Sequence, residues 1–183
     1  AGRCAAAFAM AARIWKYDAA FAEKCRIAAE SIYALGREKE GFQQGNSYKA
    51  PYRYNESTWN DDMEWGAAEL YILSNDKRYL EQAKEYALKS NTEDSWTVKD
   101  TSDHYRLYPF LNMGHYVLHG LVDTDFQKKL ESYYEEGIKY TMARANTTPF
   151  QIGVPFIWCS NNLLTSLAGQ VILYQKMTNT KAY

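Results

Sequence analysis

The order of apolar and amphipathic segments constrains the fold of this 183-residue chain more than any other feature of its sequence. Segments that are apolar on nearly every side alternate with segments that carry a single apolar stripe at helical spacing. A short polar break follows each apolar segment, and a long polar loop follows each amphipathic one. This order predicts an all-α fold of helical hairpins, each with a buried inner helix and a half-solvated outer helix.

The sequence predicts four inner helices and three outer helices. The inner helices are expected at 3–16, 59–74, 108–121 and 160–177, and the outer helices at 21–35, 77–89 and 126–145. Every loop after an outer helix returns the chain to the start of an inner helix. We therefore expect these tyrosine-rich loops to meet at one end of the helices, where a cleft would form.

Length fits one domain, and we assign residues 1–183 to a single, partial domain. Residue 183 falls where a fourth outer helix should begin, and the first apolar helix has no capping residue ahead of it. Three hairpins and a lone inner helix would leave apolar faces uncovered. We therefore expect the chain to be an internal piece of a larger domain.

Composition narrows the classes of partner. The formal net charge is -1 and no basic stripe stands out, which argues against a nucleic-acid partner. No apolar run approaches the ~20 residues of a membrane helix, and no signal peptide is visible. Tyrosine is abundant, at 16 residues, which fits either a large core or a surface built for flat ligands such as sugars.

Neither a metal nor another cofactor is predicted. The three cysteines form no CxxC pair and are odd in number, so they suggest neither a zinc site nor a disulfide framework. His115 and His119 would share a helix face, as metal ligands can, but the sequence between them lacks the glutamate of an HExxH motif.

Four segments, in order along nearly the whole chain, resemble the catalytic domain of glycoside hydrolase family 9. The most specific are WNDDMEWGAAELY at 59–71, which is similar to an acidic pair followed by W-(A/G)-A-A-x-L-Y, and VPFIWCSNN at 154–162, which is similar to a Trp-Gly-Ser-Asn segment. The Ala-rich stretch at 1–21 and NMGHYVL at 112–118 also resemble family segments.

The resemblance implies an (α/α)6 barrel, of which this chain would be an incomplete sector of about seven helices. It also implies hydrolysis of β-1,4-glucosidic bonds in cellulose or related β-glucans, by an endo- or exo-acting enzyme that is secreted or periplasmic. Such enzymes invert the anomeric centre, with an Asp base and a Glu acid whose carboxyls lie about 6.5–9.5 Å apart. The rest of the same polypeptide would complete the barrel.

The resemblance places no catalytic residue in this chain. The family's base lies in a D-A-G-D motif before the region seen here and its acid in an N-E-V-like segment after it, and neither motif occurs in the 183 residues. Asp100 and Asp103 have the bare D-x-x-D spacing without the glycine, so we interpret them as loop residues. Asp61 and Asp62 are interpreted as complements of a helix dipole and as a loop anchor. We expect the chain alone to be inactive.

Sugar binding is the function that the resemblance carries over to particular residues. Trp158 matches a family tryptophan on the glycone side of the cleft, and Tyr108 matches an aromatic, usually Trp, near the leaving-group side. Tyr52, Arg53 and Glu56 fall in a loop that borders the cleft, where Arg53 and Glu56 depart from the family's aromatics and could bind hydroxyls or a decorated sugar. Aromatic rings stack on the apolar face of a pyranose, although each residue could instead serve in packing.

Two other readings remain open at the level of sequence. One is a different (α/α)6 sugar enzyme, such as an epimerase or an unsaturated-glucuronyl hydrolase, although His115 and His119 are a poor match for such a site. The other is a non-catalytic helical-repeat scaffold that binds a partner through its loops.

Overall fold

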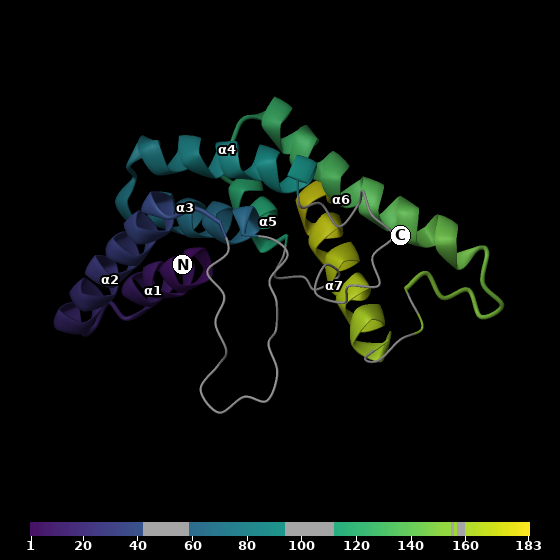
Figure 1. Ribbon diagram of the computed structural model, residues 1–183, viewed down its shortest axis with the longest axis horizontal. Helices are drawn as coiled ribbons and strands as arrows, with labels where there is room; N and C mark the ends of the chain where they lie inside the picture. The colour runs from purple at the N-terminus through teal and green to yellow at the C-terminus, as the bar shows by residue number, and fades with distance from the viewer. Residues whose placement is uncertain (42–58, 94–111, 155, 157–159) are drawn as a thin grey trace. The chain divides into compact units, whose positions relative to one another are not determined.

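The computed structural model describes residues 1–41, 59–93, 112–154, 156 and 160–183 (Figure 1). These residues form helices and connecting turns, with no strand among them. The helices are α1 (Gly2–Ile14), α2 (Ala19–Glu38), α3 (Asn60–Ser74), α4 (Lys77–Glu93), α5 (Met113–His119), α6 (Thr124–Ala145) and α7 (Ser160–Thr178). Each coincides with one of the seven predicted helices, so the all-α prediction is confirmed.

The bounds differ from the prediction mainly in α2, in α5 and in α4, which continues to Glu93 instead of ending at position 89. Gly36 follows the predicted end of the outer helix at position 35, but it lies inside α2. A Cβ at this position would come within 2.8 Å of the Ala1 Cβ atom and 2.9 Å of the Met63 sulfur atom, so the contact has room only for glycine. The glycine thus allows α2 to continue against α1 and α3. Helix α5 is described only from Met113, since residues 108–111 of its predicted span lie outside the described residues.

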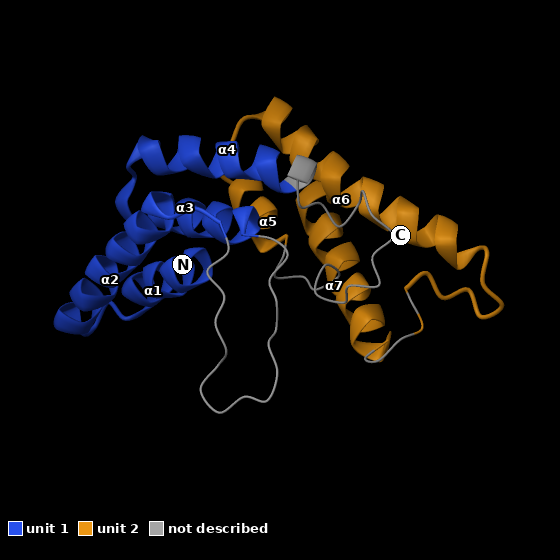
Figure 2. Cartoon of the chain, viewed as in Figure 1, with its two compact units in different colours: residues 1–90 blue, residues 91–183 orange. Residues whose placement is uncertain are grey.

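The chain divides into two compact units, Ala1–Ser90 and Asn91–Tyr183 (Figure 2). In the first unit, α1 and α3 run side by side in the same direction. Arg3 near the start of α1 pairs with Asp61 and Asp62 at the start of α3, and Arg13 near the end of α1 pairs with Glu69 further along α3. The inner helices of two successive hairpins are therefore parallel neighbours, as the predicted arrangement requires.

The outer helices α2 and α4 cover this inner pair and are also parallel to each other. The rings of Tyr33 and Tyr79 meet edge to face with centroids 5.6 Å apart, and Arg37 contacts Tyr86 one to two turns further along both helices. Buried alanines line α1, at positions 5, 6, 9 and 12, and α3, at positions 67 and 68, so the inner backbones approach closely. The sequence run that reads as apolar on every side is thus a helix contacted on several sides.

Aspartates end each short break and start the outer helix that follows. Asp18 accepts a hydrogen bond from the Phe21 amide at 2.9 Å, and Asp123 accepts one from the Phe126 amide at 3.0 Å. Asp76 accepts from the Arg78 amide at 2.9 Å, after Asn75 has turned the chain with a φ of 57°. Such capping satisfies amides that lack a partner within the helix.

The second unit is organised around α6. Tyr134 and Ile138 of α6 form a buried cluster with Val154, Leu163 and Tyr174, the last two from α7. The Tyr134 hydroxyl donates to the Asn112 carbonyl at 2.6 Å, just ahead of α5. Helix α6 thus contacts both neighbouring inner helices, α5 before it and α7 after it in the sequence.

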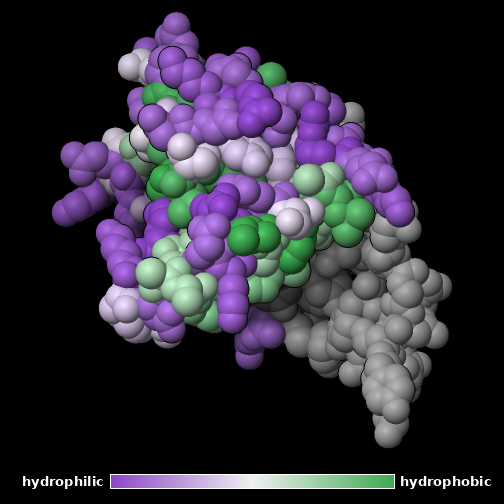
Figure 3. Space-filling view, turned by 90° about the vertical axis from the view of Figure 1, so that its left-hand side faces the viewer, coloured by the Kyte–Doolittle hydropathy of each residue, from purple (hydrophilic) through white to green (hydrophobic). Residues whose placement is uncertain are grey.

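Apolar surface remains exposed on the helices of the first unit. Among large apolar side chains that are at least a third exposed are Phe8, Ile14, Trp15, Ile27 and Leu35. Figure 3 shows apolar patches interrupting an otherwise hydrophilic face. None of the helices in the described ranges is long and apolar enough to cross a membrane.

The close approach of α1 and α3 predicts a large effect of adding one methyl group. A Cβ at Gly66 would lie 2.9 Å from the backbone carbonyl oxygen of Gly2, so Gly66→Ala should push the two helices apart and cost about 1–3 kcal/mol. Urea unfolding of the purified chain measures this. Gly120→Ala is the matched control, because its Cβ would meet only the Val117 oxygen at 3.7 Å, and equal stability of the two variants would contradict the prediction.

Candidate functional site

The five residues predicted to bind sugar all lie outside the described residues. Tyr52, Arg53 and Glu56 belong to segment 42–58, Tyr108 to segment 94–111, and Trp158 to segment 157–159. Their assignment therefore stays a prediction. The structure does describe the helix ends to which these segments attach.

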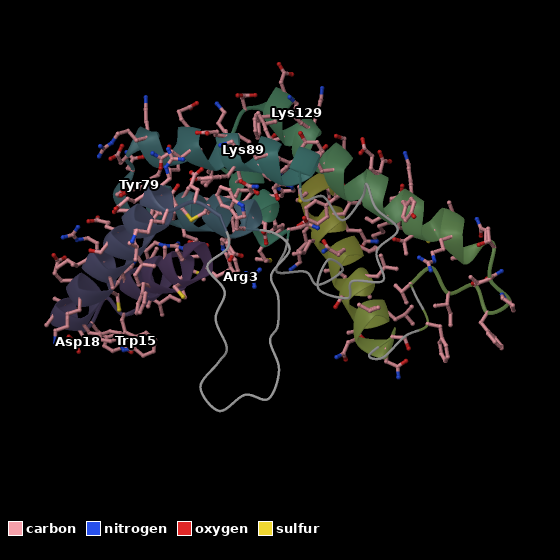
Figure 4. All side chains as sticks on the ribbon, viewed as in Figure 1. Arg3, Trp15, Asp18, Tyr79, Lys89 and Lys129 are labelled. Carbon is pink, nitrogen blue, oxygen red and sulfur yellow. The ribbon has the colours of Figure 1, made fainter. Side chains whose placement is uncertain are left out.

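One end of the first unit gathers the points where the long loops leave and return. The start of α1 lies beside the start of α3, as the Arg3 ion pairs show, and the end of α2 lies beside α4 near Tyr86. Segment 42–58 joins the end of α2 to the start of α3. The opposite end carries the short turn between α1 and α2, so that Arg3 and Trp15 mark opposite ends of α1 (Figure 4).

An arginine and two aspartates hold the starts of α1 and α3 together. Asp61 is 4% exposed and its Oδ2 atom lies 3.5 Å from Nη2 of Arg3, while Asp62 forms an ion pair with Nε of the same arginine. Both carboxylates stand in the first turn of α3, where the helix dipole also favours negative charge. This supports the interpretation of the acidic pair as a helix-dipole complement tied to a neighbouring helix.

Tyr86 of α4 is the centre of a second polar cluster at the same end. It is fully buried, and its hydroxyl donates to Oε1 of Glu40 at 2.5 Å and accepts from Nη1 of Arg37 at 2.7 Å. The ring of Trp59 meets it edge to face with centroids 6.0 Å apart. Burial and the bond to Glu40 both raise the pKa of the Tyr86 hydroxyl, so it remains protonated and acts as a donor.

A third polar contact lies inside the pair of inner helices. Glu69 of α3 is 4% exposed and pairs with Arg13 of α1. Burial raises the pKa of the Glu69 carboxyl, and the attraction of the Arg13 guanidinium opposes that rise only in part. The fold therefore disfavours the charged form of Glu69.

In the second unit, both histidines of α5 contact residues of α6. The ring of buried His115 contacts Tyr133 and Tyr134, with centroids 5.5 and 6.5 Å away. His119 places Nε2 at 2.8 Å from Oε1 of Glu131. In the described part of the chain, no three His, Cys, Asp or Glu side chains gather as metal ligands would.

The acidic partners of the arginines in α1 and the contacts of Tyr86 were not predicted from the sequence. Arg3 and Arg13 are the charges of an otherwise apolar helix, and a charge on a buried helix requires a partner. That rule could have led to acidic residues at the matching heights of α3, namely Asp61, Asp62 and Glu69. Nothing in the sequence marks Tyr86 among the other tyrosines of the outer helices.

The parallel inner helices, the capped short turns and the shared loop end define a protein of helical hairpins. Comparison with known proteins specifies which one: the sequence model described as glycosyl hydrolase family 9 matches residues 1–183. The chain therefore belongs to glycosyl hydrolase family 9, and it forms a sector of the (α/α)6 barrel. The prediction of family and fold is confirmed.

Individual relatives agree with this assignment. The chain is 28% identical over 104 residues to Endoglucanase 12 of Oryza sativa subsp. japonica, and 26% identical over 96 residues to Endoglucanase 10 of the same organism. These matches cover 55% and 52% of this chain but only 16% of each relative. The solved structure of AaCel9A in complex with cellobiose-like isofagomine superposes with a TM-score of 0.68 at 22% identity, covering 95% of this chain and 33% of that one.

The raised pKa of Glu69 predicts how stability changes with pH. Because the folded chain holds this proton more tightly than the unfolded chain does, the contribution of Glu69 to the free energy of unfolding falls as pH rises above about 4.5. Glu69→Gln should remove this decline. The free energy of unfolding of the variant, measured with urea, should therefore rise relative to that of the wild type between pH 4.5 and 7.

Glu85→Gln is the matched control for this experiment. The hydrogen bond from Lys89 lowers the pKa of Glu85, so that Glu85 contributes stability above its unfolded pKa and loses it as pH falls. The control should therefore change the pH dependence in the opposite sense. A Glu69→Gln profile parallel to that of the wild type would show that the carboxyl of Glu69 titrates normally in the fold.

Proposed function

We propose that this chain is part of an enzyme that hydrolyses β-1,4-glucosidic bonds of cellulose or related β-glucans with inversion. The observation that carries the proposal is the family match along all 183 residues. The curated relatives are named endoglucanases, and the structural neighbour was solved with a cellobiose-like isofagomine. The match also speaks against the scaffold and epimerase readings of the sequence.

The activity is ascribed to a larger protein, because the chain spans only 16% of the relatives that it matches. The catalytic Asp and Glu are proposed to lie outside these 183 residues, and Asp61 and Asp62 are not offered in their place. Both of these aspartates are engaged by Arg3, and an inverting base needs a carboxylate free to activate a water molecule. Secretion is proposed with the activity, since the substrate is polymeric.

The substrate-binding part of the proposal concerns the loop end of the helices. Tyr52, Arg53, Glu56, Tyr108 and Trp158 all belong to segments that connect an outer helix to the following inner helix. In the first unit, the helix ends that flank segment 42–58 share one end with the starts of both inner helices. Within the first unit, this common attachment supports the proposal that the segment with Tyr52, Arg53 and Glu56 borders a glucan cleft.

If the catalytic carboxylates lie elsewhere, the purified 183-residue chain should not release reducing sugar from carboxymethyl-cellulose. Binding groups alone cannot replace a general acid and base, which together contribute several orders of magnitude in rate. A longer polypeptide that includes the flanking coding sequence is the positive control. Turnover by the short chain, above that of a heat-denatured sample, would place the catalytic groups within these 183 residues.

Trp158→Ala in the longer polypeptide should weaken cello-oligosaccharide binding by ~1–3 kcal/mol, because a stacked aromatic ring and its buried area are lost. Isothermal titration calorimetry measures the change. Trp15→Ala is the matched control, since Trp15 is a partly exposed tryptophan at the end of α1 that lies away from Arg3. Unchanged affinity in a folded Trp158 variant would remove this residue from the cleft.

A further inference from the structure

The chain that follows α6 forms a tightly bonded turn. The Gln151 amide donates to the Thr148 carbonyl oxygen at 3.1 Å, which closes a β-turn with Pro149 and Phe150 at its two central positions. The Ile152 amide donates to the Thr148 hydroxyl oxygen at 2.8 Å and closes the turn a second time. Phe150 therefore stands at the tip of a turn whose backbone is fixed by hydrogen bonds.

The residues after this tip pack against α6. Gly153 is buried so close to that helix that a Cβ would overlap the Thr141 carbonyl oxygen. Val154 is 3% exposed and belongs to the buried cluster of the second unit, against which Ile152 also packs. The aliphatic side chains of the segment thus lie in the core, whereas the ring of Phe150 is 85% exposed. A firmly attached turn holds this ring in solvent.

The residue after Phe150 has a backbone conformation that its type rarely adopts. Gln151 has a φ of 53°, in the left-handed region where glycine and asparagine are usual. Residues held in such conformations gather at ligand-binding sites, since the surrounding structure must maintain them. Gln151 is also exposed, so the turn presents an amide side chain directly beside an aromatic one.

The chemistry of this part of the chain suits a neutral, hydroxylated ligand. Although 23% of all residues are charged, no Asp, Glu, Lys or Arg occurs between Arg144 and Lys176. A nucleic acid or an anionic membrane would require basic side chains here. A sugar requires an aromatic ring for the apolar face of its pyranose and uncharged polar groups for its hydroxyls. Phe150 and Gln151 offer both.

The turn belongs to the end of the second unit at which an outer helix leads to an inner helix. Helix α5 runs antiparallel to α6, because Gln127 near the start of α6 donates to the His119 carbonyl at the end of α5, and Tyr134 donates to the Asn112 carbonyl ahead of α5. The start of α5 therefore points toward the end of α6 that leads to Phe150. This is the kind of end at which the helical hairpins gather their long connections.

We propose that Phe150 is a glucan-binding residue, whose ring stacks on the apolar face of one glucose unit of a β-glucan while the Gln151 amide binds its hydroxyls. The inference rests on the proposed function, which supplies the ligand. The alternative is that another part of the longer polypeptide covers the ring, and the two arrangements differ in measurable ways.

The first test measures cellotetraose binding to the longer polypeptide by isothermal titration calorimetry. Phe150→Ala should raise Kd about three- to tenfold because one stacked ring is lost, whereas Phe150→Tyr keeps a ring and should stay within about twofold of wild type. Tyr17→Ala is the matched control, since Tyr17 is a 79% exposed aromatic residue in the short turn after α1, and its Kd should not change. An unchanged Kd in Phe150→Ala, with the wild type binding normally, overturns the inference.

Hydroxyl-radical footprinting of the wild-type longer polypeptide is a second readout that needs no variant. Mass spectrometry should show Phe150 readily oxidised in the free protein and protected by cellotetraose, but not by the α-linked maltotetraose, while oxidation of Tyr17 stays unchanged. Resistance of Phe150 to oxidation without sugar would show that the ring is covered by the polypeptide and would overturn the inference. A protein that neither hydrolyses nor binds cello-oligosaccharides refutes the proposed function and the inference with it, whereas hydrolysis without protection of Phe150 refutes the inference alone.

Discussion

The first unit depends on the close approach of α1 and α3. Small residues allow it: Gly2 lies so near the backbone of Asp62 that a Cβ would overlap its carbonyl oxygen, and Gly66 faces the Gly2 oxygen in the same way. At this separation the arginines of one helix reach the acids of the other, so Arg3 and Arg13 find partners that a wider spacing would deny them. Apolar contact and charge pairing therefore require the same geometry: packing of the small residues sets the separation of the helices, and the ion pairs offset part of the cost of placing charges beside them.

This approach also decides where function can reside. Parallel inner helices place their starts at one end, and each outer helix must then return the chain to that end. The short turns at the other end are capped by aspartates such as Asp18 and Asp76, which leaves little chain there to form a site. Within the first unit, the helix ends that flank segment 42–58 lie at the end marked by Arg3 and Tyr86. The division of the first unit into an end with short capped turns and an end with a long connecting segment follows from the helix pairing rather than from any one loop sequence.

Most of the fold could be predicted from the sequence because it depends on periodicity. Helices with a clear apolar stripe or a continuous apolar run were placed within a few residues of their observed bounds. Gly36 was misread because glycine signals a loop in sequence but here serves a close helix contact. The candidate site was less accessible: Trp158 and its companions came from a family resemblance, whereas the Tyr86 cluster depends on contacts between residues about 20 to 50 positions apart, which no local pattern encodes.

The polar clusters of the first unit differ in what they can be used for. The Arg13–Glu69 pair joins two helices whose position apolar packing already determines, and its buried carboxyl opposes folding as it ionises. The Tyr86 cluster instead joins helix α4 to chain that has left a helix, where no apolar face dictates position. A hydrogen bond contributes most to specificity where packing leaves alternatives open. On this ground the phenol hydroxyl of Tyr86 differs in use from the Arg13–Glu69 pair, because it ties α4 to Glu40, a residue beyond the end of α2, rather than joining two helices that are already packed together.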